Sequence, residues 1–328
     1  MLDTGGSGGM FGQGDVRYRL LDVCFWNRDI GWTCGVAGAF KTADGGLTWR
    51  RVQPRPGRGE GYYHVEMAGP EDVWLLKGKH PGGAGNAWLL HSVDGGNTWR
   101  EELTDQLNGY RDLYCRGSQR WVLGNAAPAF HSDDGGKTWR KLAFSNLLAD
   151  MGRLAIPADV PTEGGFTVYV LGSYQRQPRL VTSIDGGTTW SQLDLPDDLP
   201  DGYWRYRPFF ATSRTGWIGM SAGQILFTTD GGKTWAHRDV HTDQGVTALW
   251  FDQRGRGFAA VANGFVQDQG VPRMGVALYH TPDTGRTWAP VLTGKRHVDA
   301  LFGRGPRQVW AVGDVPGFVK NDVVAILQ

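Results

Sequence analysis

Residues 132–139 read Ser-Asp-Asp-Gly-Gly-Lys-Thr-Trp, one of six copies of the pattern [Ser/Thr]-x-Asp-x-Gly-x-Thr-Trp in this chain. The aspartate carboxylate can accept hydrogen bonds from the N–H groups of a tight turn, and glycine readily takes a positive φ. The tryptophan begins the next strand and can cover the apolar side of the turn. Each copy is therefore expected to close a β-hairpin. The copies occupy residues 42–49, 92–99, 132–139, 183–190, 228–235 and 281–288.

The segments between the copies have the pattern of β-strands. Successive copies are 40 to 53 residues apart, measured from tryptophan to tryptophan, which suits one four-stranded blade for each copy. Upstream of a copy, an alternating apolar run is followed by a turn and by a second run that ends in glycine, as in 22–26 and 31–35. No segment shows helical periodicity. The 50 Gly and 15 Trp also suit an all-β repeat protein.

The two ends of the chain predict how the ring closes. Residues 298–302, 308–313 and 323–328 match the first three strands of a further blade. Residues 16–20 precede the first strand of the first blade, where an outermost strand would lie. The sequence therefore predicts an all-β, seven-bladed β-propeller of four-stranded antiparallel blades, closed by the N-terminal strand completing the last blade. We expect one propeller domain over residues 15–328 after a flexible, Gly-rich segment over residues 1–14.

Composition excludes several classes of function. Lys plus Arg (34) nearly balance Asp plus Glu (33), so no global field favours nucleic acid or an anionic membrane. No run approaches the roughly 18 apolar residues of a membrane span, and no motif for a metal, nucleotide or other cofactor is present. A monomer without a cofactor is expected. Cys24 and Cys34 flank a predicted hairpin; two buried free thiols are the expectation, and a disulfide is the alternative.

The six copies resemble the Asp-box, or bacterial neuraminidase repeat. In that family the box joins the third and fourth strands of a blade, on the face away from the functional one. The form Gly-Trp-x-x-Gly followed by [Ser/Thr]-x-Asp-Gly-Gly-x-Thr-Trp is most similar to the photosystem II stability/assembly factor group, whose members are scaffolds that hold partner proteins. The resemblance implies structural roles for the box residues Asp44, Trp49, Asp94, Trp99, Asp134, Trp139, Asp185, Trp190, Asp230, Trp235, Asp283 and Trp288.

The face opposite the boxes is the predicted binding face. Its interblade loops and the loops between second and third strands are rich in Arg and aromatic residues, the composition of a recognition surface. We expect a non-catalytic, extracytoplasmic (periplasmic or secreted) propeller that holds a protein partner or an anionic or carbohydrate ligand. The candidate binding residues are Arg58, Tyr62, Tyr63, Tyr110, Arg111, Tyr174, Arg176, Tyr203, Trp204, Arg205, Tyr206, Arg207, Arg273, Arg296 and His297.

The alternative function is that of an Asp-box glycosidase or a polysaccharide lyase. A sialidase-like site would use Arg111, Arg205 and Arg273 with Tyr206 as the nucleophile, but the early Arg-Ile-Pro motif of sialidases is absent. A glycosidase with two carboxylates would draw on acids of the same loops. These acids are Glu60, Asp105, Asp198, Asp201, Asp243 and Asp268. The histidines His91, His131 and His280 each precede a box on a different blade, so they are not expected to share a metal ion.

Overall fold

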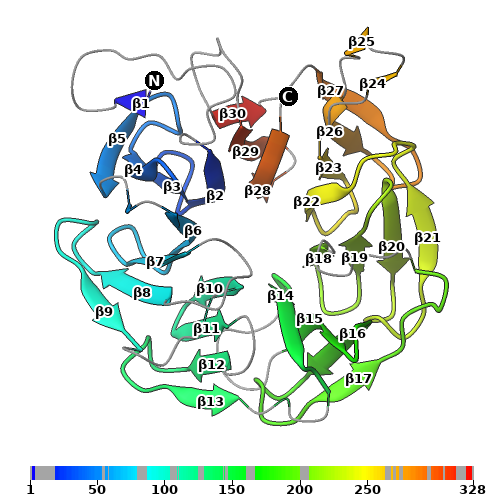
Figure 1. Ribbon diagram of the computed structural model, residues 1–328, viewed down its shortest axis with the longest axis horizontal. Coiled ribbons are helices and arrows are strands. Elements are labelled where there is room, and N and C mark those ends of the chain that lie inside the picture. The colour runs from blue at the N-terminus through cyan, green and yellow to red at the C-terminus, as the bar shows by residue number, and fades with distance from the viewer. Residues whose placement is uncertain are drawn as a thin grey trace.

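The computed structural model is a ring of small β-sheets around a central axis (Figure 1). In each blade the chain starts at the axis and moves outward strand by strand, as the order of hydrogen-bonded neighbours shows. The residues that the structure describes are 2–3, 19–53, 56–57, 59–79, 87–103, 109, 111–124, 129–142, 144, 147–159, 167–199, 207–262, 267–268, 271–272, 276–293, 297–305, 307–314 and 323–326.

Six blades contain four consecutive antiparallel strands each. The first blade contains β2 (Leu20–Phe25), β3 (Gly31–Gly35), β4 (Gly38–Thr42) and β5 (Trp49–Gln53). The second contains β6 (Glu60–Met67), β7 (Val73–Lys79), β8 (Ala87–Ser92) and β9 (Arg100–Glu102). The third contains β10 (Asp112–Arg116), β11 (Gln119–Leu123), β12 (Ala129–Ser132) and β13 (Arg140–Leu142). The fourth blade contains β14 (Asp150–Ala155), β15 (Val168–Tyr174), β16 (Gln177–Ser183) and β17 (Ser191–Leu193). The fifth contains β18 (Arg207–Phe210), β19 (Gly216–Gly219), β20 (Gln224–Thr228) and β21 (Ala236–Asp239). The sixth contains β22 (Val246–Phe251), β23 (Gly257–Val261), β26 (Val276–Thr281) and β27 (Ala289–Thr293).

The prediction of seven four-stranded blades is wrong, because six complete blades are found among the described residues. The last sheet has three strands, β28 (His297–Gly305), β29 (Gln308–Asp314) and β30 (Val323–Ile326), and no described N-terminal strand pairs with it. Leu20 instead opens β2, the innermost strand of the first blade, and residues 16–18 lie outside the described residues. The short strand β1 (Leu2–Asp3) pairs in parallel with β5, which makes the first sheet five-stranded. A two-stranded hairpin, β24 (Gln267–Asp268) and β25 (Val271–Pro272), interrupts the sixth blade.

The hydrophobic core lies between neighbouring blades. One cluster joins Trp74, Leu76 and Leu89 of the second blade to Leu113 and Val122 of the third. The sheets are narrow, so each must bury both of its faces against its neighbours, and the second strands β11 and β19 are accordingly buried along their whole length. Burial at 20–30 cal/mol per Å2 of apolar surface makes these interfaces the main favourable term in folding.

Each Asp box is a hairpin turn held by its own side chains. In the third box, Ser132 Oγ donates to Asp134 Oδ1 (2.7 Å) and accepts from the Gly136 N–H (2.8 Å). Thr138 donates its N–H to Asp134 Oδ1 (2.9 Å) and its hydroxyl to Oδ2 (2.6 Å). These donors favour the ionised carboxylate. The corresponding bonds in the second box, from Thr98 above all, lower the pKa of Asp94 to about 2.

The sixth box departs from the pattern at one strained position. Thr284 stands where the other boxes have their first glycine, and its φ is +65°. A β-branched residue is disfavoured there. We expect Thr284→Gly to raise the free energy of unfolding by about 1 kcal/mol through relief of this strain. Urea denaturation checks the prediction; a destabilised variant would show that the contact between the Thr284 methyl group and Gly255 outweighs the backbone strain.

Candidate functional site

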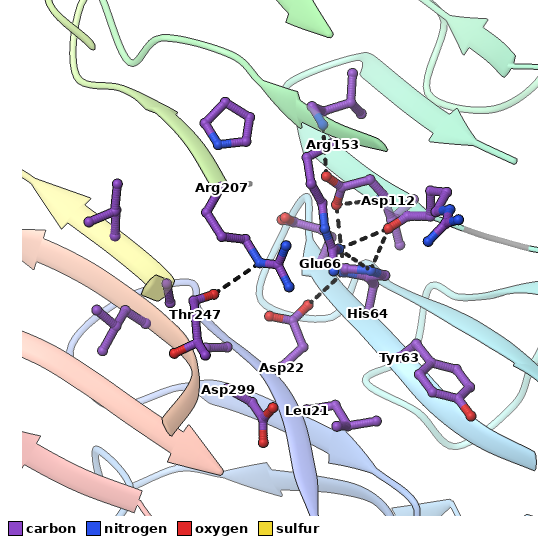
Figure 2. Close-up of a pocket in the computed structure, with 18 of the residues that line it drawn as sticks. Leu21, Asp22, Tyr63, His64, Glu66, Asp112, Arg153, Arg207, Thr247 and Asp299 are labelled. Carbon is purple, nitrogen blue, oxygen red and sulfur yellow. Dashed lines mark hydrogen bonds and ion pairs between the residues drawn. The ribbon is translucent and has the colours of Figure 1, made fainter. Parts of the chain in front are cut away.

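A cavity of about 410 Å3 lies on the axis of the ring, where the innermost strands meet (Figure 2). The six blades and the three-stranded sheet each contribute their first strand to the wall, and each of these strands presents at least one polar side chain. The polar residues of the wall are Arg19, Asp22, His64, Glu66, Arg111, Asp112, Arg153, Arg207, Thr247 and Asp299.

Irregular pairing of the inner strands explains why charged residues reach the cavity. Register shifts interrupt the pairing of the first with the second strand between Leu20 and Asp22, between Tyr62 and His64, and between Met151 and Arg153. A β-bulge bends its strand and re-aims the side chains around it. The inner strands therefore keep their apolar residues between the blades while Asp22, His64 and Arg153 lie along the axis.

The aspartates of the wall connect adjacent blades. Asp22 Oδ2 accepts from the backbone N–H of Val65 on the next blade (3.0 Å). Asp112 Oδ2 accepts in the same way from the N–H of Leu154 (2.8 Å). Asp299, in the three-stranded sheet, binds the guanidinium of Arg19, with 2.7 Å between Nε and Oδ2. Hydrogen bonds from His297 and Arg19 hold the pKa of Asp299 below its usual range against the opposing effect of burial.

His64 is enclosed by charged groups from three blades. Its Nδ1 lies 3.3 Å from Asp22 Oδ2 and 3.6 Å from Asp112 Oδ1. Its Nε2 lies 3.0 Å from the carbonyl oxygen of Arg111 and 3.1 Å from Nη1 of Arg153. Arg153 Nη1 also donates to the same carbonyl at 2.9 Å. One imidazole thus connects two carboxylates to a guanidinium (Figure 2).

Two further groups of the wall have strongly shifted pKa values. Burial, with the nearby charge of Arg153, lowers the pKa of Arg207 to about 9, and its Nε donates to the Thr247 carbonyl (3.0 Å). Burial also raises the pKa of Glu66 well above its ordinary value, and the charges of Asp22 and Asp112 add to that effect. A cationic guanidinium held away from bulk water interacts more strongly with an anion than one at the surface does.

The candidate binding residues lie in several different places. Tyr63, Arg111 and Arg207 line the cavity. His297 lies beside it with its Nε2 3.1 Å from Asp299 Oδ1, whereas Tyr62 is buried between the first two blades. Tyr174 and Arg176 lie at the tip of the β15–β16 hairpin and are absent from the cavity wall. The remaining candidates lie outside the described residues: Arg58, Tyr110, Tyr203, Trp204, Arg205, Tyr206, Arg273 and Arg296.

Much of the cavity wall was missed from the sequence because the search was confined to loops. Asp22, His64, Asp112, Arg153 and Asp299 all lie in the first strands of their blades. Their signal was available. Each is a charged or titratable residue in a run that otherwise contains apolar residues, and four of the five (all but Arg153) lie seven to nine residues before the start of the next strand.

Of the carboxylates proposed for a glycosidase, Glu60, Asp198 and Asp243 are described and are absent from the cavity wall. Glu60 binds Lys77 Nζ (2.9 Å), whose hydrogen bond holds the Glu60 pKa below its usual range. Asp198 and Asp243 are exposed residues away from the wall. Asp268 lies in β24, while Asp105 and Asp201 are outside the described residues, as are Arg205, Tyr206 and Arg273 of the sialidase-like set.

Other reactive side chains have structural surroundings. The described residues contain no group of three His, Cys, Asp or Glu side chains suited to a metal ion. His91 stacks on Trp74 with 3.7 Å between ring centroids, and His131 stacks on Trp121 at 4.1 Å. Burial lowers the pKa of His131 to about 4. Cys24, Cys34 and Cys115 are buried free thiols, and burial raises the pKa of each.

The fold and the site define an Asp-box β-propeller with a polar axial cavity. The box turns join the third and fourth strands, and no box aspartate lines the cavity. The comparisons with known proteins agree with this class. A family model described as photosynthesis system II assembly factor YCF48 matches residues 82–156. The resemblance to the photosystem II assembly factor group, predicted from the repeats, is confirmed.

One curated relative is the photosystem II assembly lipoprotein Ycf48 of Synechococcus sp. (strain CC9902), 22% identical over 237 residues. The match covers 70% of this chain and 65% of the relative, so it spans about two thirds of that protein. No helix among the described residues is long and apolar enough to cross a membrane.

Solved propellers show the same fold. The structure titled "YCF48 bound to D1 peptide" has a TM-score of 0.65 at 20% identity and covers 92% of this chain and 91% of its own. YCF48 from Cyanidioschyzon merolae has a TM-score of 0.66 at 16% identity, with 94% and 95% covered. A GH74 xyloglucanase from Xanthomonas campestris has a TM-score of 0.66 at 17% identity over 92% of this chain and 51% of the enzyme. At these identities the structures show the fold, which assembly factors and glycosidases share.

Proposed function

We propose that this chain is a non-catalytic, assembly-factor-like propeller that holds an acidic segment of a partner protein at its axial cavity. The observation that carries the proposal is the convergence of Arg111, Arg153 and Arg207 on one cavity in which Asp22 and Asp112 are engaged by backbone N–H groups of the next blade. The carboxylates thus hold the ring together, while the guanidinium groups supply positive charge facing the cavity. The likeness to YCF48, one structure of which contains a bound peptide, supports a protein partner.

The same contacts argue against glycoside hydrolysis. A glycosidase needs one carboxylic acid to protonate the leaving group and a second carboxylate as base or nucleophile. Asp22 and Asp112 accept hydrogen bonds from Val65 and Leu154, and both face His64. Proton transfer or covalent attack by either carboxylate would remove its negative charge and so weaken the hydrogen bond that joins two blades. A carbohydrate ligand bound without chemistry is the second candidate, because the aromatic ring of Tyr63 also lines the wall.

We propose that the protein works outside the cytoplasm. A curated relative is named a lipoprotein, which supports this location. The three buried free cysteines are compatible with it, because burial protects thiols from oxidants.

The acidic-segment proposal predicts a loss of affinity when Arg207 is changed. The probe is a fluorescent dodecapeptide with four Asp or Glu residues, and its isosteric Asn/Gln counterpart reports the part of binding that needs no charge. A buried charged contact contributes about 2–3 kcal/mol, so we expect Arg207→Ala to weaken binding of the acidic peptide by at least tenfold and to leave the neutral peptide unaffected. Fluorescence anisotropy measures both affinities at constant ionic strength.

Arg254→Ala is the matched control, because Arg254 is an exposed arginine in the turn between β22 and β23, away from the cavity wall. Its affinity for the acidic peptide should equal that of the wild type. Thermal melting verifies that both variants are folded. Equal binding of the acidic peptide by wild type and a folded Arg207→Ala variant would refute the proposal.

A further inference from the structure

Three atoms on the cavity wall form a triangle whose stability depends on one proton. His64 Nε2, Arg153 Nη1 and the Arg111 carbonyl oxygen lie 2.9–3.1 Å from one another. The carbonyl can only accept a hydrogen bond and the guanidinium can only donate one. The contact between Nε2 and the carbonyl is therefore favourable only when Nε2 is protonated, and the contact between Nε2 and Arg153 only in the tautomer that has no proton on Nε2.

The other ring nitrogen fixes this tautomer. Nδ1 faces the carboxylates of Asp22 (3.3 Å) and Asp112 (3.6 Å), which can only accept when ionised. The neutral imidazole consequently carries its proton on Nδ1 and offers the Nε2 lone pair to Arg153. Protonation at Nε2 converts this acceptor into a donor, directed at the Arg111 carbonyl. The imidazolium then repels the guanidinium of Arg153, which must give up its contact with the ring.

We propose that His64 is a proton-operated switch of the cavity: protonation releases Arg153 from the imidazole toward the cavity and adds a positive charge to the wall, so anionic ligands bind more tightly at lower pH. The proposal rests on the proposed function, since it concerns the regulation of the same site. An imidazole is suited to the task because its charge ordinarily changes between about pH 5 and 8. The charged or titratable groups around it are Asp22 from β2, Glu66 from its own strand β6, Arg111 and Asp112 at the start of β10, and Arg153 from β14.

The position of the His64 side chain supports a role in the cavity in addition to a role in packing. The side chain of His64 is 14% exposed, and the residue lines the wall beside Arg153. His91 and His131, by contrast, are buried against tryptophan rings away from the axis. Arg153 in turn lowers the pKa of Arg207, so moving its guanidinium changes the field at the arginine on which the proposed function depends.

The test uses benzene-1,3-disulfonate, an anion whose own charge does not change between pH 8.0 and 5.5. Calorimetric titration of the full chain at constant ionic strength should show binding about tenfold tighter at pH 5.5, within the usual range of linked binding equilibria. His64→Gln should bind equally at the two pH values. His237→Gln, at an exposed histidine outside the cavity, should retain the wild-type pH dependence.

Glu66 is the competing titratable group of the wall, and Glu66→Gln distinguishes the two. The switch predicts that Glu66→Gln keeps the pH dependence; loss of the dependence in this variant but not in His64→Gln would overturn the assignment. Linkage supplies a measurement that needs no variant. If protonation strengthens disulfonate binding, bound disulfonate must raise the proton affinity of His64 by the same factor, which NMR detects as a titration midpoint shifted to higher pH. An unmoved midpoint, or wild-type affinity equal at the two pH values, would refute the switch and leave the peptide experiment on Arg207 to decide the proposed function.

Discussion

Replacing Gly136 by alanine is expected to lower the free energy of unfolding by about 2–5 kcal/mol. Two effects add. Gly136 has a φ of +92°, where an L-residue is strained by about 1–2 kcal/mol. A Cβ atom there would also lie 2.5 Å from Cη2 of Trp74, which is fully buried in the preceding blade. The indole cannot retreat without opening the packed interface between the second and third blades, which adds an overpacking cost of about 1–3 kcal/mol.

Gly135→Ala is the matched control, because it isolates the backbone term. Gly135 precedes Gly136, has a φ of +79°, and no atom lies within 4 Å of the position its Cβ would take. This variant should lose only about 1–2 kcal/mol. Urea denaturation monitored by tryptophan fluorescence compares the two. Equal losses for both variants would show that the interface between blades does not constrain the second glycine of the box.

The contact of Gly136 with the preceding blade explains why the second glycine of the box is kept, which turn geometry alone does not explain. Gly96 and Gly187 hold the same relation to Trp32 and Trp121, with 2.5 Å from the virtual Cβ to the indole in each case. A turn with two positive-φ positions could carry Asn or Asp at either one. The sixth box replaces its first glycine by Thr284 and keeps its second, Gly285. The first position thus tolerates strain.

Local sequence patterns therefore predicted what is local in this fold. The hydrogen bonds of each box lie within eight residues, so hairpins and the blade-by-blade order of strands could be read from the six copies. Closure could not be read in this way, because pairing between residues far apart in sequence depends on packing as well as on alternation. Alternation made residues 16–20 a plausible outer strand, yet Leu20 is fully buried at the axis end of the first blade.

The cavity shows the same limit. Arg111 and Arg207 were expected from their loop neighbours; Arg111 directly precedes β10 and Arg207 is the first residue of β18. Asp22, Asp112 and Arg153 were missed because a charge within an apolar strand, although visible in the sequence, does not indicate which groups it will face in the folded ring. Only closure of the ring brings these strands together, and in β2 and β14 a bulge also directs the polar residue toward the axis.

The second large effect is expected at the point where the ring closes, in Trp310→Ala. Trp310 lies in β29 of the three-stranded sheet and is 4% exposed. Its ring stacks on Phe25 of the first blade with 3.9 Å between centroids, and its indole N–H donates to the carbonyl of Gly45 (2.9 Å). Truncating a buried tryptophan typically costs 3–5 kcal/mol, and here the lost contacts join segments at opposite ends of the chain.

In urea denaturation we expect Trp310→Ala to lower the free energy of unfolding by about 4 kcal/mol. We also expect faster hydrogen exchange in the first blade, because β2 and β29 lie against each other where the ring closes. Trp26→Ala is the control. Trp26 is 40% exposed and lies beside the same junction between the first blade and the last sheet, so this variant should lower the free energy of unfolding by less than about 1 kcal/mol. The ion pair between Arg19 and Asp299 also joins the first blade to the last sheet, but it is partly exposed and contributes less to the free energy of unfolding than the buried indole does. A small loss for Trp310→Ala with no change in exchange over residues 20–25 would mean that the last sheet does not hold the ring closed.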